Sequence, residues 1–174
     1  MRELVFLASM APTSPFVLFQ VADSLLAIPQ RYVAEVLPLP DLEPPPGAPP
    51  VLAGFLNLGG SPLPVIDAAR LFDPEAEPTT ALYAHILRVV PEAAATFGLL
   101  VAQVTDVAVS SEGEAALSEA DSLGGVLRAN LMFGGRIAAH LDVDRLLLRE
   151  EALRVEALGA VAQARLAGWS EEVT

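Results

Sequence analysis

The stretch LNLGGSPLPVIDAARL at residues 56–71 returns, at an offset of 75 residues, as LMFGGRIAAHLDVDRL at residues 131–146. Each copy has a Gly-Gly pair between two apolar runs. The second run ends in an aspartate that is separated from an Arg-Leu pair by two residues. Gly-Gly supplies the positive φ angles that a two-residue hairpin needs. An aspartate at a strand end accepts hydrogen bonds from the first free amides of a helix. The sequence therefore predicts two hairpin units with structural strand-end caps at Asp67 and Asp142.

Short strands are expected through the first 142 residues, because apolar residues alternate there with a period of two between turn residues. The expected strands are 16–22, 24–28, 33–37, 52–58 and 63–66, followed by 82–90, 96–102, 104–109, 126–133 and 136–141. Five strands in each half would leave open edges unless each set closes into a small barrel. The predicted fold class is mainly β, with two pseudo-repeated five-stranded barrel subdomains at about 16–72 and 81–142.

The remaining segments have compositions of their own. We expect an N-terminal extension at 1–15, a stiff connector in the proline-rich stretch 38–50 and a linker at 72–80. The proline-rich stretch alternatively suits an aromatic groove on a partner. A change to helical period predicts a C-terminal α-helix at 144–167 and leaves a tail at 168–174. The apolar stripe of that helix either packs on the barrels or docks on another protein.

The charge balance excludes several partners. The net charge is −12 and all ten basic residues are arginine, so a phosphate backbone would be repelled and nucleic acid is not expected as a partner. The charge-free stretches 4–22 and 44–66 contain proline or glycine in their interiors, which argues against membrane insertion. Apolar residues make up 53% of the chain and charged residues only 18%, which suggests that a partner covers part of the surface.

The chain offers few groups for catalysis. Cysteine and lysine are absent, which excludes thiolate metal sites and Schiff-base chemistry. His85 lies within an expected strand and is read as structural. His140, Asp142 and Asp144 have metal-ligand chemistry. Strand alternation, however, puts Arg136 on one polar face with His140 and Asp142, and strand-end capping already explains Asp142. We therefore expect no catalytic residue, metal or cofactor, and keep a metal-dependent enzyme at these three residues as a minor alternative.

Several motifs together resemble the CheW-like chemotaxis coupling domain. They are FQV at 19–21, LAIP at 26–29, VAEV at 33–36, LAGFLNLGG at 52–60, PVID at 64–67, FGLLV at 97–101 and LDVDRLL at 141–147, and the likeness covers about 16–148. The resemblance implies a pair of five-stranded barrels without enzymatic activity. It further implies a cytoplasmic scaffold that joins chemoreceptor tips to the regulatory domain of a CheA-type histidine kinase.

The same resemblance implies a receptor-facing groove near six residues: Val33, Glu35, Gly54, Asn57, Gly59 and Gly60. The family hairpin is commonly Asn-Leu-Arg-Gly, and its arginine can pair with the glutamate equivalent to Glu35. Here Gly59 replaces that arginine, so Glu35 needs another partner, and Arg31 and Arg70 are the candidates considered. The alternative function is a self-assembling module that has lost receptor coupling and forms homo-oligomers through its apolar surface.

Overall fold

The computed structural model describes residues 14–111, 115–118, 121–146, 159, 163–165 and 167 of the chain. Within these residues the fold is mainly β, as predicted. The strands are β1 (Phe16–Val21), β2 (Ser24–Pro29), β3 (Val33–Pro38), β4 (Leu52–Leu58), β5 (Ser61–Asp67), β6 (His85–Val89), β7 (Phe97–Val101), β8 (Gln103–Ala108), β9 (Ala115–Ala116), β10 (Leu127–Phe133) and β11 (Arg136–Leu141). A 3₁₀ turn, η1 (Gln30–Tyr32), precedes β3, and a short helix, α1 (Ala68–Phe72), follows β5.

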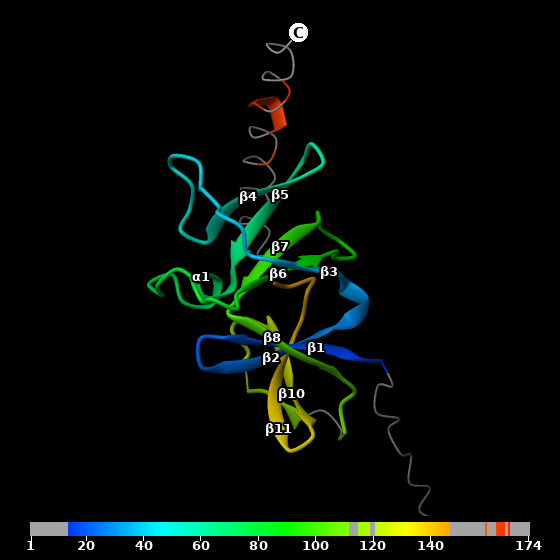
Figure 1. Cartoon of the computed structure of the whole chain (residues 1–174). Coiled ribbons are helices and arrows are strands. Elements are labelled where there is room, and N and C mark those ends of the chain that lie inside the picture. The colour runs from blue at the N-terminus through cyan, green and yellow to red at the C-terminus, as the bar shows by residue number, and fades with distance from the viewer. Residues whose placement is uncertain are drawn as a thin grey trace, which may run out of the picture.

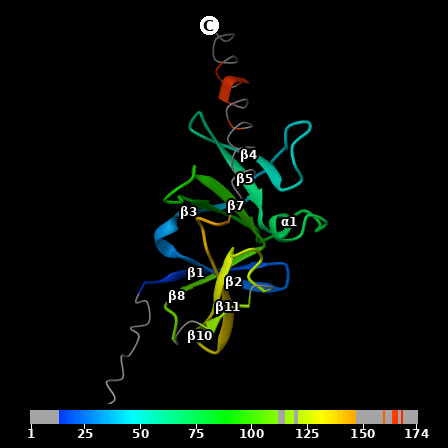
Figure 2. The ribbon, with the colours of Figure 1, turned by 180° about the vertical axis from the view of Figure 1, so that it is seen from behind.

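The strands form two sheets that lie at opposite ends of the molecule (Figures 1 and 2). One sheet has the order β8-β1-β2-β11-β10-β9 and the other has the order β3-β6-β7-β5-β4. Each sheet therefore combines strands from both halves of the sequence, which corrects the expected division into 16–72 and 81–142. Four pairings join the two halves: the antiparallel pairs β1 with β8 and β3 with β6, and the parallel pairs β2 with β11 and β5 with β7. The parallel registers are Leu26 to Ala139 and Val65 to Gly98.

Neither sheet is a closed barrel, because each hydrogen-bonded order ends in two edge strands. The six-stranded sheet nevertheless curls until its two sides meet. The backbone nitrogen of Ser111, just after β8, donates to the carbonyl of Met132 on β10 at 2.9 Å. The Nη2 atom of Arg136 on β11 also lies 3.6 Å from Oδ2 of Asp106 on β8. The curl brings together strands that are not neighbours in the sheet.

The largest buried cluster lies between the two sheets and holds them together. It includes Phe19 and Ile28 from the first sheet and Leu87, Phe97 and Leu99 from the second, all of them 1% exposed or less. Each sheet also has a smaller apolar cluster on its other face: one around Phe16, Leu131 and Phe133, and one around Val65, Ile86 and Leu100. Interior strands such as β1 and β7 are therefore buried on both faces, which explains their nearly continuous apolar sequences.

The described residues of the C-terminal segment are helical and lie beyond β4 (Figure 1). Gly159 approaches Phe55 on β4, since a Cβ built on Gly159 would lie 3.9 Å from the Phe55 ring. Asp144 and Arg145 form a turn rather than the expected start of the helix. Most of the helix predicted at 144–167, residues 1–13 of the extension predicted at 1–15 and the tail at 168–174 lie outside the described residues. No helix within the described part is long and apolar enough to cross a membrane.

Candidate partner-binding site

Asp67 caps α1 and fixes the segment that follows the helix. Its Oδ1 accepts from the backbone nitrogen of Ala69 at 3.0 Å and from the hydroxyl of Thr79 at 2.7 Å. Its Oδ2 accepts from the backbone nitrogen of Thr79 at 2.8 Å. Only 2% of Asp67 is exposed. The cap is the one that the sequence predicted, while the contacts with Thr79 were not anticipated.

Asp142, the repeat mate of Asp67, caps a turn instead of a helix. Its Oδ1 accepts from the backbone nitrogens of Asp144 at 3.1 Å and Arg145 at 3.3 Å. Its Oδ2 lies 3.8 Å from Arg128 and 4.0 Å from the side chain of Arg145. These distances are longer than ordinary hydrogen bonds, so the contacts with the two arginines are ionic and weak.

The β4–β5 hairpin turns at Gly59 and Gly60, whose φ angles are +62° and +93°. These angles are the ones that a two-residue turn between twisted strands requires. Asn57 closes the turn, because its Oδ1 accepts from the backbone nitrogen of Gly60 at 2.7 Å. A Cβ built on either glycine would meet nothing within 4 Å. The tip of the hairpin is therefore open to solvent and to a partner.

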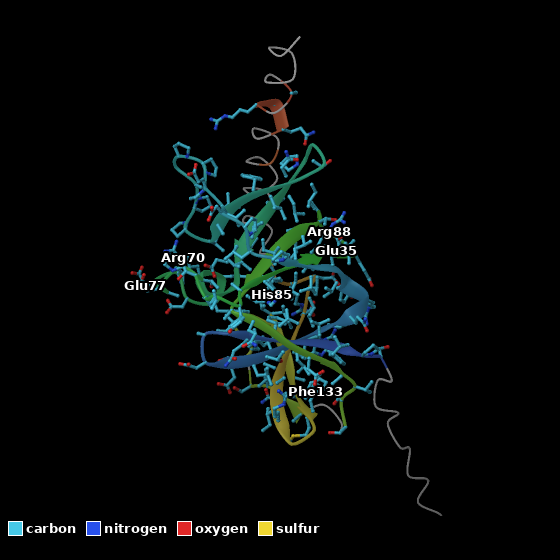
Figure 3. All side chains as sticks on the ribbon, in the orientation of Figure 1. Glu35, Arg70, Glu77, His85, Arg88 and Phe133 are labelled. Atoms are coloured by element: carbon cyan, nitrogen blue, oxygen red, sulfur yellow. The ribbon has the colours of Figure 1, made fainter. Side chains whose placement is uncertain are left out.

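Glu35 finds its partner on the neighbouring strand. Arg88 on β6 lies opposite Glu35 on β3 in the sheet register, and its Nη1 donates to Glu35 Oε2 at 3.2 Å. Figure 3 shows the two labelled side chains together on the side of the molecule where the β4–β5 hairpin ends. Sequence reasoning missed Arg88, although it lies in an expected strand, because the pairing of that strand with β3 was not known.

The two arginines that the sequence offered to Glu35 are engaged elsewhere. Arg31 stacks on the Tyr32 ring at 4.4 Å and donates to the Tyr32 hydroxyl at 3.0 Å. Arg70 donates to the backbone carbonyls of Ala76 at 3.1 Å and Pro50 at 3.2 Å. Neither of them bonds to Glu35. The guanidinium of Arg70 instead joins the segment after α1 to the end of the proline-rich connector.

Two of the six expected site residues lie mainly inside the fold. Val33 is half-buried and packs against the central core. Gly54 is buried on β4 and has a φ of +149°. A Cβ on Gly54 would come within 3.1 Å of both Leu42 and Glu43, so the glycine lets the proline-rich connector lie directly on the strand. Val33 and Gly54 therefore determine how the neighbouring segments pack and contribute little exposed surface of their own.

The other four expected residues are exposed, at two edges of one sheet. Glu35 belongs to the edge strand β3, whereas Asn57, Gly59 and Gly60 belong to the hairpin of the opposite edge strand β4. No hydrogen bond or ion pair among the described residues joins Glu35 to this hairpin. The site is therefore an extended surface rather than a single pocket.

A groove of about 470 Å³ lies elsewhere on the surface, between the proline-rich connector and the segment after α1. Leu39, Leu42 and Leu100 contribute apolar side chains. The charged lining residues are Asp41, Asp67 and Arg70. The side chains of Asp67 and Arg70 are held by the bonds described above. The sequence suggested a connector here, and the groove arises because two proline-rich segments meet in space.

His140 packs against an aromatic side chain. It is 8% exposed, and its ring meets Phe16 edge-on, with the centroids 5.1 Å apart. The expected polar face shared with Arg136 is wrong: Ala138 and His140 on that face are buried. No group of three or more histidine, aspartate or glutamate residues in the described part of the chain could hold a metal ion. His85 is half-buried and its Nδ1 accepts from the backbone nitrogen of Val104 at 3.5 Å, a structural contact.

Comparisons with known proteins agree on one family. The family model described as the CheW-like domain matches residues 15–151. A curated chemotaxis protein CheW from Rhizobium meliloti (strain 1021) is 29% identical over 137 residues, which cover 76% of this chain and 86% of that protein. The crystal structure of the scaffolding protein TtCheW from Thermoanaerobacter tengcongensis matches with a TM-score of 0.70 at 19% identity, covering 80% of this chain and 92% of that one. The chain therefore belongs to the CheW-like family.

Proposed function

We propose that this protein is a non-enzymatic adaptor that joins the cytoplasmic tips of chemoreceptors to the regulatory domain of a CheA-type histidine kinase. It would act in the cytoplasm, beside membrane receptor arrays, in chemotaxis or a related motility or regulatory pathway. The observation that carries the proposal is the CheW-like domain over residues 15–151. Two similar proteins are described as a chemotaxis protein and a scaffolding protein, which supports the same role.

The exposed residues support binding rather than turnover. Edge strand β3 presents Ala34, Glu35 and Val36 to solvent, and 45% of Val36 is exposed. An edge strand with exposed apolar side chains is a natural docking surface for another protein. Glu35 also has an arginine partner, although position 59 is a glycine. This partner is Arg88 on β6 instead of an arginine in the β4–β5 hairpin.

The test is a binding assay with two purified partners from the same genome: a cytoplasmic fragment of a chemoreceptor and the regulatory domain of a CheA-type kinase. Wild-type protein should bind both. Val36→Asp should weaken receptor binding, because it places a charge on exposed β3, whereas Gly59→Arg should keep it. Val33→Asp is a less specific variant, since Val33 packs on the core. The melting temperature of Val33→Asp therefore has to be measured together with its affinity.

A matched control is Val107→Asp, which changes an equally exposed valine on the edge strand of the other sheet. It should keep receptor binding. Absence of binding to either partner by the folded wild-type protein would contradict the adaptor role.

Self-assembly is the second candidate, and one apolar surface favours it. Val107, Val109 and Ile137 are 51%, 49% and 60% exposed. The ion pair between Asp106 and Arg136 brings their strands, β8 and β11, to the same side of the curled sheet. Light scattering on the full chain, on Ile137→Asp and on a chain truncated after Glu150 tests this candidate. A monomer at all concentrations would reject it.

A further inference from the structure

The ion pair between Glu35 and Arg88 is poorly built for stability. The two side chains are 49% and 40% exposed, and exposed pairs contribute about 0 to 1 kcal/mol. Arg88 Nε, in addition, is shut off from solvent and has no hydrogen-bond partner within the described structure. A buried donor without a partner costs free energy. The pair therefore has no evident net value for the fold.

The same geometry is well suited to presenting a carboxylate. Arg88 lies on the interior strand β6, and it bonds to one oxygen of Glu35, Oε2. The other oxygen, Oε1, accepts no hydrogen bond from any described residue. Glu35 thus has one oxygen fixed by the protein and one available, with half of its side chain open to solvent. A carboxylate can accept several hydrogen bonds at once, so it can serve Arg88 and a second donor together.

We propose that Glu35 Oε1 accepts a charge-assisted hydrogen bond from a lysine or arginine of the partner, and that Arg88 is the positioning residue that holds Glu35 for this contact. The inference rests on the proposed function, since it takes the receptor tip as the partner. Arg88 on β6 then provides the arginine partner of Glu35 that the hairpin, with a glycine at position 59, does not provide. The recognised group is a basic side chain that reaches the edge strand β3.

The overall charge favours a basic partner. The chain has a net charge of −12, and a field of this sign attracts cationic groups and raises their association rate at low salt. Of the arginines near this edge, Arg31 is held on Tyr32 and Arg88 on Glu35. An incoming cation therefore meets a carboxylate whose position is already set, and the loss of side-chain entropy on binding is smaller.

The experiment measures the dissociation constant for a purified receptor-tip fragment, with the melting temperature of each variant. Glu35→Gln should weaken binding about tenfold, because a charge-assisted bond becomes a neutral one. Its affinity should also depend less steeply on salt than that of the wild-type protein. Arg88→Met should weaken binding by a smaller factor while the melting temperature stays the same or rises.

The charge-swapped double variant Glu35→Arg with Arg88→Glu separates the proposal from a purely structural role. It restores an ion pair across β3 and β6 but presents a cation at position 35, so it should fold normally and bind the tip at least tenfold more weakly than wild type. Asp106→Asn is the matched control. It removes the same charge from a similarly exposed pair, Asp106 and Arg136, on the other sheet, and should leave the affinity unchanged.

Two results would overturn the inference while the adaptor role stands: wild-type affinity in the charge-swapped variant, or equal effects of Glu35→Gln and Asp106→Asn. Failure of the wild-type protein to bind the tip at all would instead reject the proposed function and this inference with it.

Discussion

The carboxylate of Asp67 holds Thr79 by two hydrogen bonds, 2.8 Å to its backbone nitrogen and 2.7 Å to its hydroxyl. A third bond, from Ala69, caps α1. One buried side chain thus fixes the helix that ends the first repeat and the segment that leads to β6. The same segment forms a wall of the 470 Å³ groove, so the position of Asp67 also shapes the molecular surface.

Replacement of Asp67 by alanine should lower the free energy of unfolding by about 2 to 4 kcal/mol, because a helix cap and two bonds to a buried carboxylate are lost together. Chemical denaturation measures the change. Glu77→Ala is the matched control, since Glu77 lies in the same segment with an exposed side chain (Figure 3). It should change the stability by less than about 0.5 kcal/mol. Equal effects of the two variants would contradict the role given to Asp67.

Gly98 on β7 is a second position where stability should respond sharply. A Cβ at this position would lie 2.7 Å from Cγ2 of Ile86 and 3.2 Å from Cγ2 of Val65. Gly98→Ala should therefore destabilise the protein by about 1 to 3 kcal/mol through overpacking. Adding Ile86→Leu removes the methyl group on Cβ that causes the clash. The double variant should be more stable than the sum of the two single changes predicts, as a double-mutant cycle can measure.

The local elements of the fold could be predicted from the sequence. The bounds of β4 and β11 agree with the expected strands, and both Gly-Gly hairpins form where the repeat places them. Apolar alternation and turn residues act over a few positions, so a single sequence shows them directly. The strand β9 was missed because it is only Ala115–Ala116, too short for any alternation.

The pairing of strands could not be predicted in the same way. The repeat suggested that each half forms its own barrel, yet β2 pairs with β11 and β5 with β7 across the halves. Sequence periodicity fixes which face of a strand is apolar but not which strand lies beside it. The same limit hid the partner of Glu35, since Arg88 is 53 positions away and becomes its neighbour only through the β3–β6 register.

Metal removal should leave the protein unchanged. His140 is packed against Phe16, and Asp142 Oδ1 accepts bonds from two backbone nitrogens, so these groups are not arranged as metal ligands. The melting temperature should be the same with EDTA and with added Zn²⁺. Elemental analysis of the purified protein should find no stoichiometric metal. A clear stabilisation by one metal ion, lost in His140→Ala, would revive the metal-dependent alternative.

Gly47 in the proline-rich connector and Gly54 on β4 should respond differently to the same substitution. Gly47 and Gly54 both have positive φ angles, +77° and +149°, but a Cβ on Gly47 would meet nothing within 4 Å. Gly47→Ala should therefore cost only backbone strain, about 1 to 2 kcal/mol. Gly54→Ala carries strain as well, and its Cβ would come within 3.1 Å of Leu42 and the carbonyl of Glu43.

The connector has to move away from β4 to make room for a side chain at position 54, so Gly54→Ala should be more destabilising than Gly47→Ala. It should also speed hydrogen exchange in residues 39–50, because the connector loses its close packing on the strand. Hydrogen exchange measured by mass spectrometry on both variants checks this. Equal exchange in the two would show that the connector is held by other contacts, such as the bond from Arg70 to the carbonyl of Pro50 at 3.2 Å.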